Sequence, residues 1–149
     1  MFDRWFLAGA ASAVEAALAS IPPARTGTIA VVGHGRLAAA LVRPGRALSL
    51  IDAEPAAIKR PPTDVTLADA PPADRSLAAL VVVGLGERDD WDPALTAWSR
   101  WVVDGGGVVM VDRGPAIELS RRALCGGLTA LEQRVAGRWI VTSGLVSDL

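Results

Sequence analysis

The feature that most constrains this fold is a series of short apolar runs, most of which end in glycine or aspartate. The clearest runs cover residues 28–32, 47–51, 65–68, 77–85 and 108–111. Their apolar residues are consecutive rather than alternating, which indicates strands that are buried on both faces. Stretches of helical composition separate most of the runs, so the chain is expected to form an α/β fold with a mostly parallel sheet covered by helices.

The segments between the runs predict helices. The expected helices cover residues 2–20, 36–42, 55–60, 93–103 and 115–124. Residues 128–135 and 139–145 are joined at a glycine and predict a hairpin at one edge of the sheet. No linker or internal repeat divides the sequence, so residues 1–149 are expected to form a single domain, with an N-terminal helix within residues 1–23 packed on it.

Composition narrows the classes of function. The net charge is −1, without the basic excess of a typical nucleic-acid-binding domain, although Arg121, Arg122 and Arg134 are candidates for a local basic patch. Cys125 is the single cysteine and there is one histidine, so neither an intrachain disulfide nor a Cys/His metal site is expected. The apolar N-terminal stretch is interrupted by Glu15 and is too short to span a bilayer. We therefore expect a cytoplasmic protein with neither a membrane nor a nucleic-acid partner.

Ligands of doubly wound sheets bind beyond the carboxyl ends of the strands, near the switch in strand order. The candidate binding residues in that position are Gly33, His34, Gly35, Asp52, Ala53, Asp69, Ala70 and Gly84. Gly33-x-Gly35-x-x-Ala38 satisfies the loose dinucleotide fingerprint, and Asp52 lies near the spacing expected for a ribose ligand. Glycines also occur wherever a strand turns tightly into a helix, so a plain turn and an NAD-type site both remain open.

Two further stretches carry a family resemblance. Residues 98–106 read Trp-Ser-Arg-Trp-Val-Val-Asp-Gly-Gly and precede the apolar run that ends at Asp112, while residues 67–76 contain Asp69 shortly after the third run. Over residues 28–145 the chain resembles class I S-adenosylmethionine (SAM) methyltransferases of the type 11 kind. The resemblance implies a Rossmann-like sheet of seven strands in the order 3-2-1-4-5-7-6, with the last strand antiparallel. It also implies SAM as cofactor, with Asp52 on the ribose hydroxyls and Asp69 near the adenine.

The first glycine loop departs from the family pattern. The family carries an acid two residues ahead of a Gly-x-Gly-x-Gly loop, whereas residues 31–37 read Val-Val-Gly-His-Gly-Arg-Leu. The acid and one glycine are absent, so the first SAM-binding motif is degenerate. In the family this loop lies against the methionine part of SAM.

Three functions remain open at this point. The first is a SAM-dependent methyltransferase that acts on a small molecule or on a group presented by a partner. The second is a non-catalytic, methyltransferase-like subunit that serves as a protein-interaction scaffold, with a protein partner or as a homo-oligomer. The third is an NAD-type dinucleotide binder.

Methyl transfer depends mainly on in-line positioning, and a general base helps when the acceptor is protonated. His34, Glu87 and Asp89 are the weak candidates for that base. The alternative for His34 is a solvated turn, and the alternative for residues 87–90 is a helix entry capped by Asp90 or Asp92. The tryptophans at positions 5, 91 and 139 are candidates for an exposed patch, with core packing as the alternative.

Overall fold

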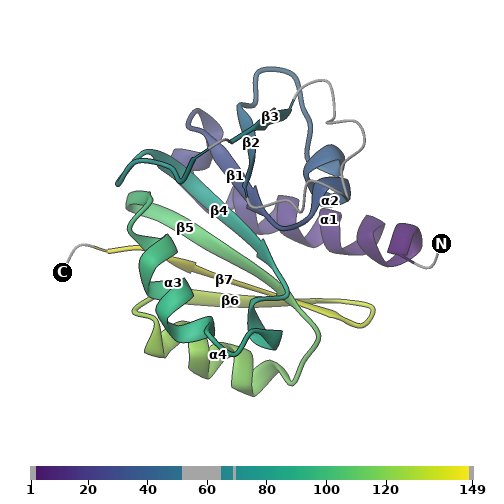
Figure 1. The fold of residues 1–149 in the computed structure, drawn as a ribbon. Coiled ribbons are helices and arrows are strands. Elements are labelled where there is room, and N and C mark those ends of the chain that lie inside the picture. Colours follow the sequence, from purple (N-terminus) through teal and green to yellow (C-terminus); the bar gives the residue numbers. More distant parts are fainter. Residues whose placement is uncertain (1–2, 52–64, 69, 148–149) are drawn as a thin grey trace.

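The computed structural model describes residues 3–51, 65–68 and 70–147 (Figure 1). The helices are α1 (Asp3–Ala19), η1 (Pro22–Arg25), α2 (Gly35–Ala40), η2 (Leu85–Glu87), α3 (Trp91–Ser99) and α4 (Ala116–Cys125). The strands are β1 (Ile29–Val32), β2 (Leu48–Ile51), β3 (Val65–Leu67), β4 (Leu77–Val83), β5 (Val102–Asp112), β6 (Thr129–Ala136) and β7 (Trp139–Leu145). The helix predicted over residues 55–60 lies outside the described residues.

All seven strands belong to one sheet, in the order β3-β2-β1-β4-β5-β7-β6. Strands β1 to β5 pair in parallel, while β7 runs antiparallel to both β5 and β6. The fold class and the strand order that the resemblance implied are therefore confirmed, as is the terminal hairpin.

The central strands are buried on both faces, as the consecutive apolar residues predicted, whereas Thr66 and Leu67 of the edge strand β3 are exposed. Figure 1 shows α1 and α2 on one side of the sheet and α3 and α4 on the other. Successive residues of a strand point to opposite faces. Accordingly, Val31 of β1 and Val81 of β4 belong to the apolar cluster with α1 and α2. Their neighbours Val32 and Val82 belong to the cluster with α3 and α4.

The region between α3 and β5 differs from the sequence prediction. Helix α3 begins at Trp91 and ends at Ser99, and β5 already begins at Val102, which had been assigned to the helix. The glycines predicted to precede the strand lie within it. A Cβ on Gly106 would lie 2.5 Å from the carbonyl oxygen of Ala78. Glycine is required there because the two strands approach closely beside a shift in register, and periodicity does not reveal such a contact.

The N-terminal helix packs on the sheet through one side. Its buried residues Ala10, Val14, Ala17 and Leu18 join the cluster on the α1 side. Within the described ranges, no helix combines the length and the apolar character needed to cross a membrane.

Candidate functional site

The switch in strand order lies between β1 and β4, which are adjacent in the sheet. Gly33 directly follows β1 and Gly84 directly follows β4, and both have a φ of +79°. Gly33 N–H donates to the carbonyl of Ile51 (3.1 Å) and Gly84 N–H to that of Val111 (2.9 Å). A Cβ on either glycine would meet nothing within 4 Å. Both turns therefore present bare backbone to open space where α/β sheets bind ligands.

His34 lies next to this opening and caps α2. Its Nδ1 accepts a hydrogen bond from the backbone N–H of Leu37 at 3.1 Å. A neutral imidazole that accepts at Nδ1 carries its proton on Nε2, so in this state the outer nitrogen is a donor. The base role of His34 stays a prediction, and it requires the imidazole to change tautomer and release the cap. Gly35 begins α2, which is six residues long.

Glu87 and Asp89 are exposed residues after β4, and Glu87 ends η2. Asp90 occupies the N-cap position of α3, but its side chain makes no capping hydrogen bond. Instead Arg88 donates to both Asp90 oxygens, at 2.8 and 3.0 Å, and this hydrogen bonding lowers the pKa of Asp90. The N-cap position predicted for Asp90 is thus confirmed, but its side chain pairs with Arg88 instead of bonding the helix backbone.

The remaining candidates are placed only in part. Asp52, Ala53 and Asp69 lie outside the described residues, so their assignment to the ribose and the adenine stays a prediction. Ala70 is an exposed residue shortly after β3.

Among the described residues, one buried acid also lies at this edge of the sheet. Asp112 ends β5 and is 3% exposed. Its Oδ1 accepts a hydrogen bond from Gly86 N–H at 2.9 Å. Its Oδ2 is buried and has no hydrogen-bond partner among the described residues. Burial raises the pKa of Asp112, and the charge of Glu87 adds to the effect, against the hydrogen bond from Gly86 and the charge of Arg122.

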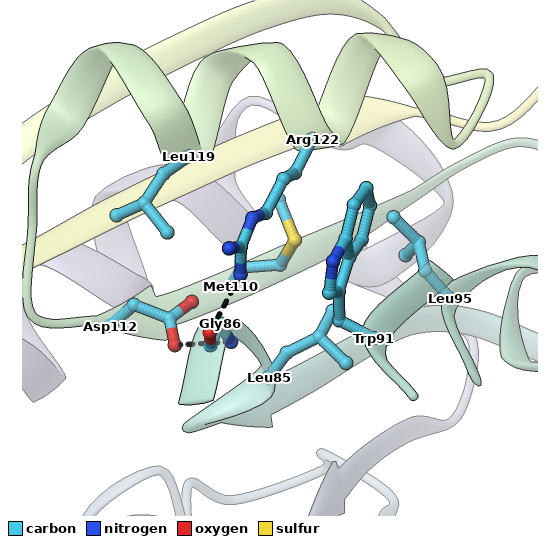
Figure 2. Close-up of a pocket in the computed structure, with 8 residues that line it drawn as sticks. All are labelled: Leu85, Gly86, Trp91, Leu95, Met110, Asp112, Leu119 and Arg122. Atoms are coloured by element: carbon cyan, nitrogen blue, oxygen red, sulfur yellow. Dashed lines mark hydrogen bonds between the residues drawn. The ribbon is translucent and has the colours of Figure 1, made fainter. Parts of the chain in front are cut away.

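Asp112 lines a small pocket between η2, α3, β5 and α4 (Figure 2). The pocket is lined by Leu85, Gly86, Trp91, Leu95, Met110, Asp112, Leu119 and Arg122. Arg122 donates from Nη1 to the Gly86 carbonyl at 2.6 Å, and its Cζ lies 4.9 Å from the centre of the Trp91 ring. Its Nε also donates to Glu118 at 3.1 Å. Arg122 therefore ties α4 to the turn after β4 and to the start of α3.

Two arginines of the suggested basic patch share one acid, and two tryptophans of the suggested apolar patch lie on different faces of the sheet. Arg121 and Arg122 both bond Glu118, whose pKa these hydrogen bonds lower to about 2, so their charge is partly neutralised. Trp91 packs against the cluster on the α3 side of the sheet, whereas Trp139 packs against the cluster on the α1 side. These two rings therefore belong to opposite faces. The side chain of the third tryptophan of that patch, at position 5, is outside the described part of the structure.

Neither a protein-family model nor a curated protein sequence matches this chain. Solved structures do match. One is the complex between the Haloferax volcanii Trm112 methyltransferase activator and a protein assigned as a methyltransferase. The identity is 14%, the TM-score is 0.73, and the match covers 99% of this chain and 96% of that one.

A second match is the Burkholderia thailandensis 1,6-didemethyltoxoflavin-N1-methyltransferase, at 12% identity and a TM-score of 0.68, over 89% of this chain and 77% of that one. A third is an O-methyltransferase family protein from the same organism, at 15% identity and a TM-score of 0.67. That match covers 84% of this chain but 52% of the other, so the chain spans about half the length of that protein. With the strand order, these likenesses show that the chain has the fold of class I SAM-dependent methyltransferases.

Proposed function

We propose that this protein binds SAM at the carboxyl edge of β1, β2 and β4 and transfers its methyl group to a small molecule or to a group presented by a partner. The observation that carries the proposal is the pair of open glycine turns, Gly33 and Gly84, on either side of the switch in strand order. A side chain at either position would project into the space that a nucleotide-like ligand needs for close contact with the backbone.

The residues that would hold the cofactor fall into two groups. The backbone of Gly33, His34, Gly35 and Gly84 would line it, and the resemblance assigns its ribose and adenine to Asp52 and Asp69. Support for this cofactor comes from similar structures, among them PigF with SAH and human N-acetylserotonin methyltransferase with SAM. SAM, when bound, supplies an electrophilic methyl group on a sulfonium. The chain contributes binding and orientation, which methyl transfer chiefly requires.

Calorimetric titration with SAM and with its demethylated product SAH tests the proposal. We expect saturable binding with a Kd on the order of 10 μM. Asp52→Ala should weaken it at least about tenfold, equivalent to about 1.4 kcal/mol. The matched control is Asp74→Ala, since Asp74 is an exposed acid in the turn before β4. Absence of heat with either ligand at about 1 mM would contradict cofactor binding, because a Kd weaker than this corresponds to a binding free energy of less than about 4 kcal/mol.

A second function, a partner-dependent or non-catalytic subunit, has support of its own. The Trm112 complex contains a chain of nearly matching extent, and its activator is a separate protein. In the present chain, Ile117, Leu124 and Val135 are large apolar residues that are 86%, 61% and 73% exposed. Light scattering after size-exclusion chromatography, combined with the SAM titration, separates the two functions. A stable oligomer that binds neither SAM nor SAH favours the scaffold, and a SAM-binding monomer favours the transferase.

The dinucleotide alternative has less support. In that class the pyrophosphate uses the free N–H groups at the start of the first helix. Here the side chain of His34 already accepts the N–H of Leu37, and α2 has six residues. Quenching of NADH fluorescence on addition of the protein would favour this alternative over the transferase.

A further inference from the structure

We propose that the pocket beside Asp112 is a binding subsite for a primary ammonium group, and that this group anchors the methyl acceptor. The assignment to the acceptor rests on the proposed function. The pocket's preference for an ammonium group does not, because it follows from the side chains that line it.

The first argument is the unpaired oxygen of a buried acid. Asp112 is 3% exposed, and only Oδ1 has a partner, the N–H of Gly86. Asp112 is one of the residues around the pocket, and its Oδ2 is a buried acceptor with no donor from the described residues. Native proteins rarely leave a buried polar atom unsatisfied, because desolvation without a replacement hydrogen bond is costly. A ligand that brings N–H groups to Oδ2 would remove that cost.

The second argument is charge. Arg122 is the cation nearest to Asp112 in the lining, but its described hydrogen bonds go to the carbonyl of Gly86 and to Glu118. Asp112 feels the charges of Glu87 and Arg122, and Arg122 also pairs with Glu118. Arg122 therefore compensates Asp112 only in part. Burial is the main cause of the raised pKa of Asp112, and the charge of Glu87 adds to it. A cationic donor is therefore favoured over a neutral one.

The third argument is size and wall chemistry. The space beside Asp112 is comparable to that of about one water molecule, which is also the size of an –NH₃⁺ group. Leu85, Leu95, Met110 and Leu119 supply apolar walls around it. Figure 2 shows the guanidinium of Arg122 between Asp112 and Trp91. A compact ammonium group fits this space, whereas the larger planar guanidinium or a quaternary ammonium does not.

The position of the pocket connects it with the proposed methyl donor. Strands β4 and β5 are adjacent, and the turn from Gly84 to Gly86 joins the open glycine edge to the pocket. An ammonium held by Asp112 has no lone pair, so it cannot itself attack the methyl carbon. It acts as an anchor, and a different oxygen or nitrogen of the acceptor would receive the methyl group.

The test is an NMR titration of the ¹⁵N-labelled full chain with propylammonium chloride, with 1-propanol and sodium chloride as comparison probes. We expect a saturable shift of the Gly86 amide with a Kd on the order of millimolar, and nuclear Overhauser contacts from the propyl group to Leu119 and Met110. Asp112→Asn should raise the Kd at least about tenfold. Asp92→Asn, a matched change at an exposed acid of α3, should leave the Kd unchanged.

Several results would overturn the subsite. These are no saturable shift at Gly86, an equal Kd in Asp112→Asn, an equal response to 1-propanol, or no contacts to Leu119 and Met110 in the unmodified protein. The last result needs no variant, so it decides the matter even if Asp112→Asn does not fold. SAM is absent from the titration. If SAM binds in its own titration but propylammonium does not, only the subsite is refuted. If propylammonium binds but SAM does not, only the proposed function is refuted.

Discussion

Asp112 at the end of β5 accepts a hydrogen bond from the backbone N–H of Gly86, 26 residues earlier in the chain, at 2.9 Å. The bond joins the turn after β4 to the end of the neighbouring strand. Arg122 bonds the carbonyl of the same glycine, so the peptide groups on both sides of Gly86 are fixed by side chains of β5 and α4. The turn between the open glycine edge and the pocket is thus held in place by Asp112 and Arg122.

The first prediction concerns the pH dependence of stability. Burial raises the pKa of Asp112 above its ordinary value of 3.8. The folded state then holds this proton more tightly than the unfolded state. The contribution of Asp112 to stability is therefore greatest below pH 3.8 and is lost as the pH rises through the raised pKa.

Asp112→Asn removes this titration while keeping an oxygen for Gly86. We expect the free energy of unfolding of the unmodified protein to fall, relative to that of the variant, as the pH rises from about 4 to about 7. Urea unfolding of both proteins across this range measures the difference. A difference that is flat with pH, or that grows in favour of the unmodified protein, would show that the buried carboxylate is not penalised.

The second prediction concerns Arg122, whose side chain is 24% exposed. Arg122→Ala removes the hydrogen bond to Gly86 and the stacking on Trp91, and we expect a loss of about 1–3 kcal/mol in the free energy of unfolding. Arg121→Ala is the matched control, because Arg121 bonds the same Glu118 but is 57% exposed. Its loss should stay below about 1 kcal/mol. Equal losses in the two variants would place the stabilisation in the Glu118 pair alone.

Features set by a local sequence pattern could be predicted, whereas features set by contacts between distant residues could not. The strands were predictable because a strand buried on both faces shows a continuous apolar run, as in residues 81–83. The boundary of β5 was missed because Gly106 is required by a neighbouring strand rather than by a turn. The contacts of Gly86 with Asp112 and Arg122 join residues 26 and 36 apart, so no local spacing encodes them. Asp112 was recognisable as the end of a strand, but its burial depends on how α4 packs.

The third prediction concerns Glu15, an acid within the apolar stretch of α1. Glu15 of α1 accepts two hydrogen bonds from Arg46, at 2.7 and 3.0 Å, and both side chains are less than one-fifth exposed, at 17% and 15%. Arg46 also donates to the carbonyl of Leu41 at 2.9 Å. The pair links α1 to the segment before β2. Glu15→Ala leaves the Arg46 charge without its carboxylate, and we expect a loss of about 3 kcal/mol.

Arg43 provides the control for this pair. It contacts the same carboxylate at 3.3 Å but is 59% exposed, so Arg43→Ala should cost less than about 1 kcal/mol. Chemical unfolding of Glu15→Ala, Arg46→Ala and the double variant gives the coupling energy. A coupling near zero would mean that the two side chains stabilise the fold independently.

The fourth prediction separates backbone strain from cofactor binding. Gly33, Gly84 and Gly45 share a φ of +78° or +79°, and a Cβ on any of them would meet nothing within 4 Å. Alanine at each position should therefore cost a similar amount of stability, about 1 kcal/mol, because an L residue is strained at this φ. Gly33 and Gly84 lie at the proposed SAM site, whereas Gly45 lies in the turn between α2 and β2.

Titration of the three alanine variants with SAM should then show different affinities at the proposed site and away from it. Gly33→Ala and Gly84→Ala place a methyl group against the ligand, and we expect each to weaken SAM binding at least about tenfold. Gly45→Ala has the same strain and should bind SAM as the unmodified protein does. Equal weakening in all three would trace the loss to stability rather than to contact with SAM. No weakening in any of them would place the cofactor away from the two glycine turns, since methyl groups there would then not touch it.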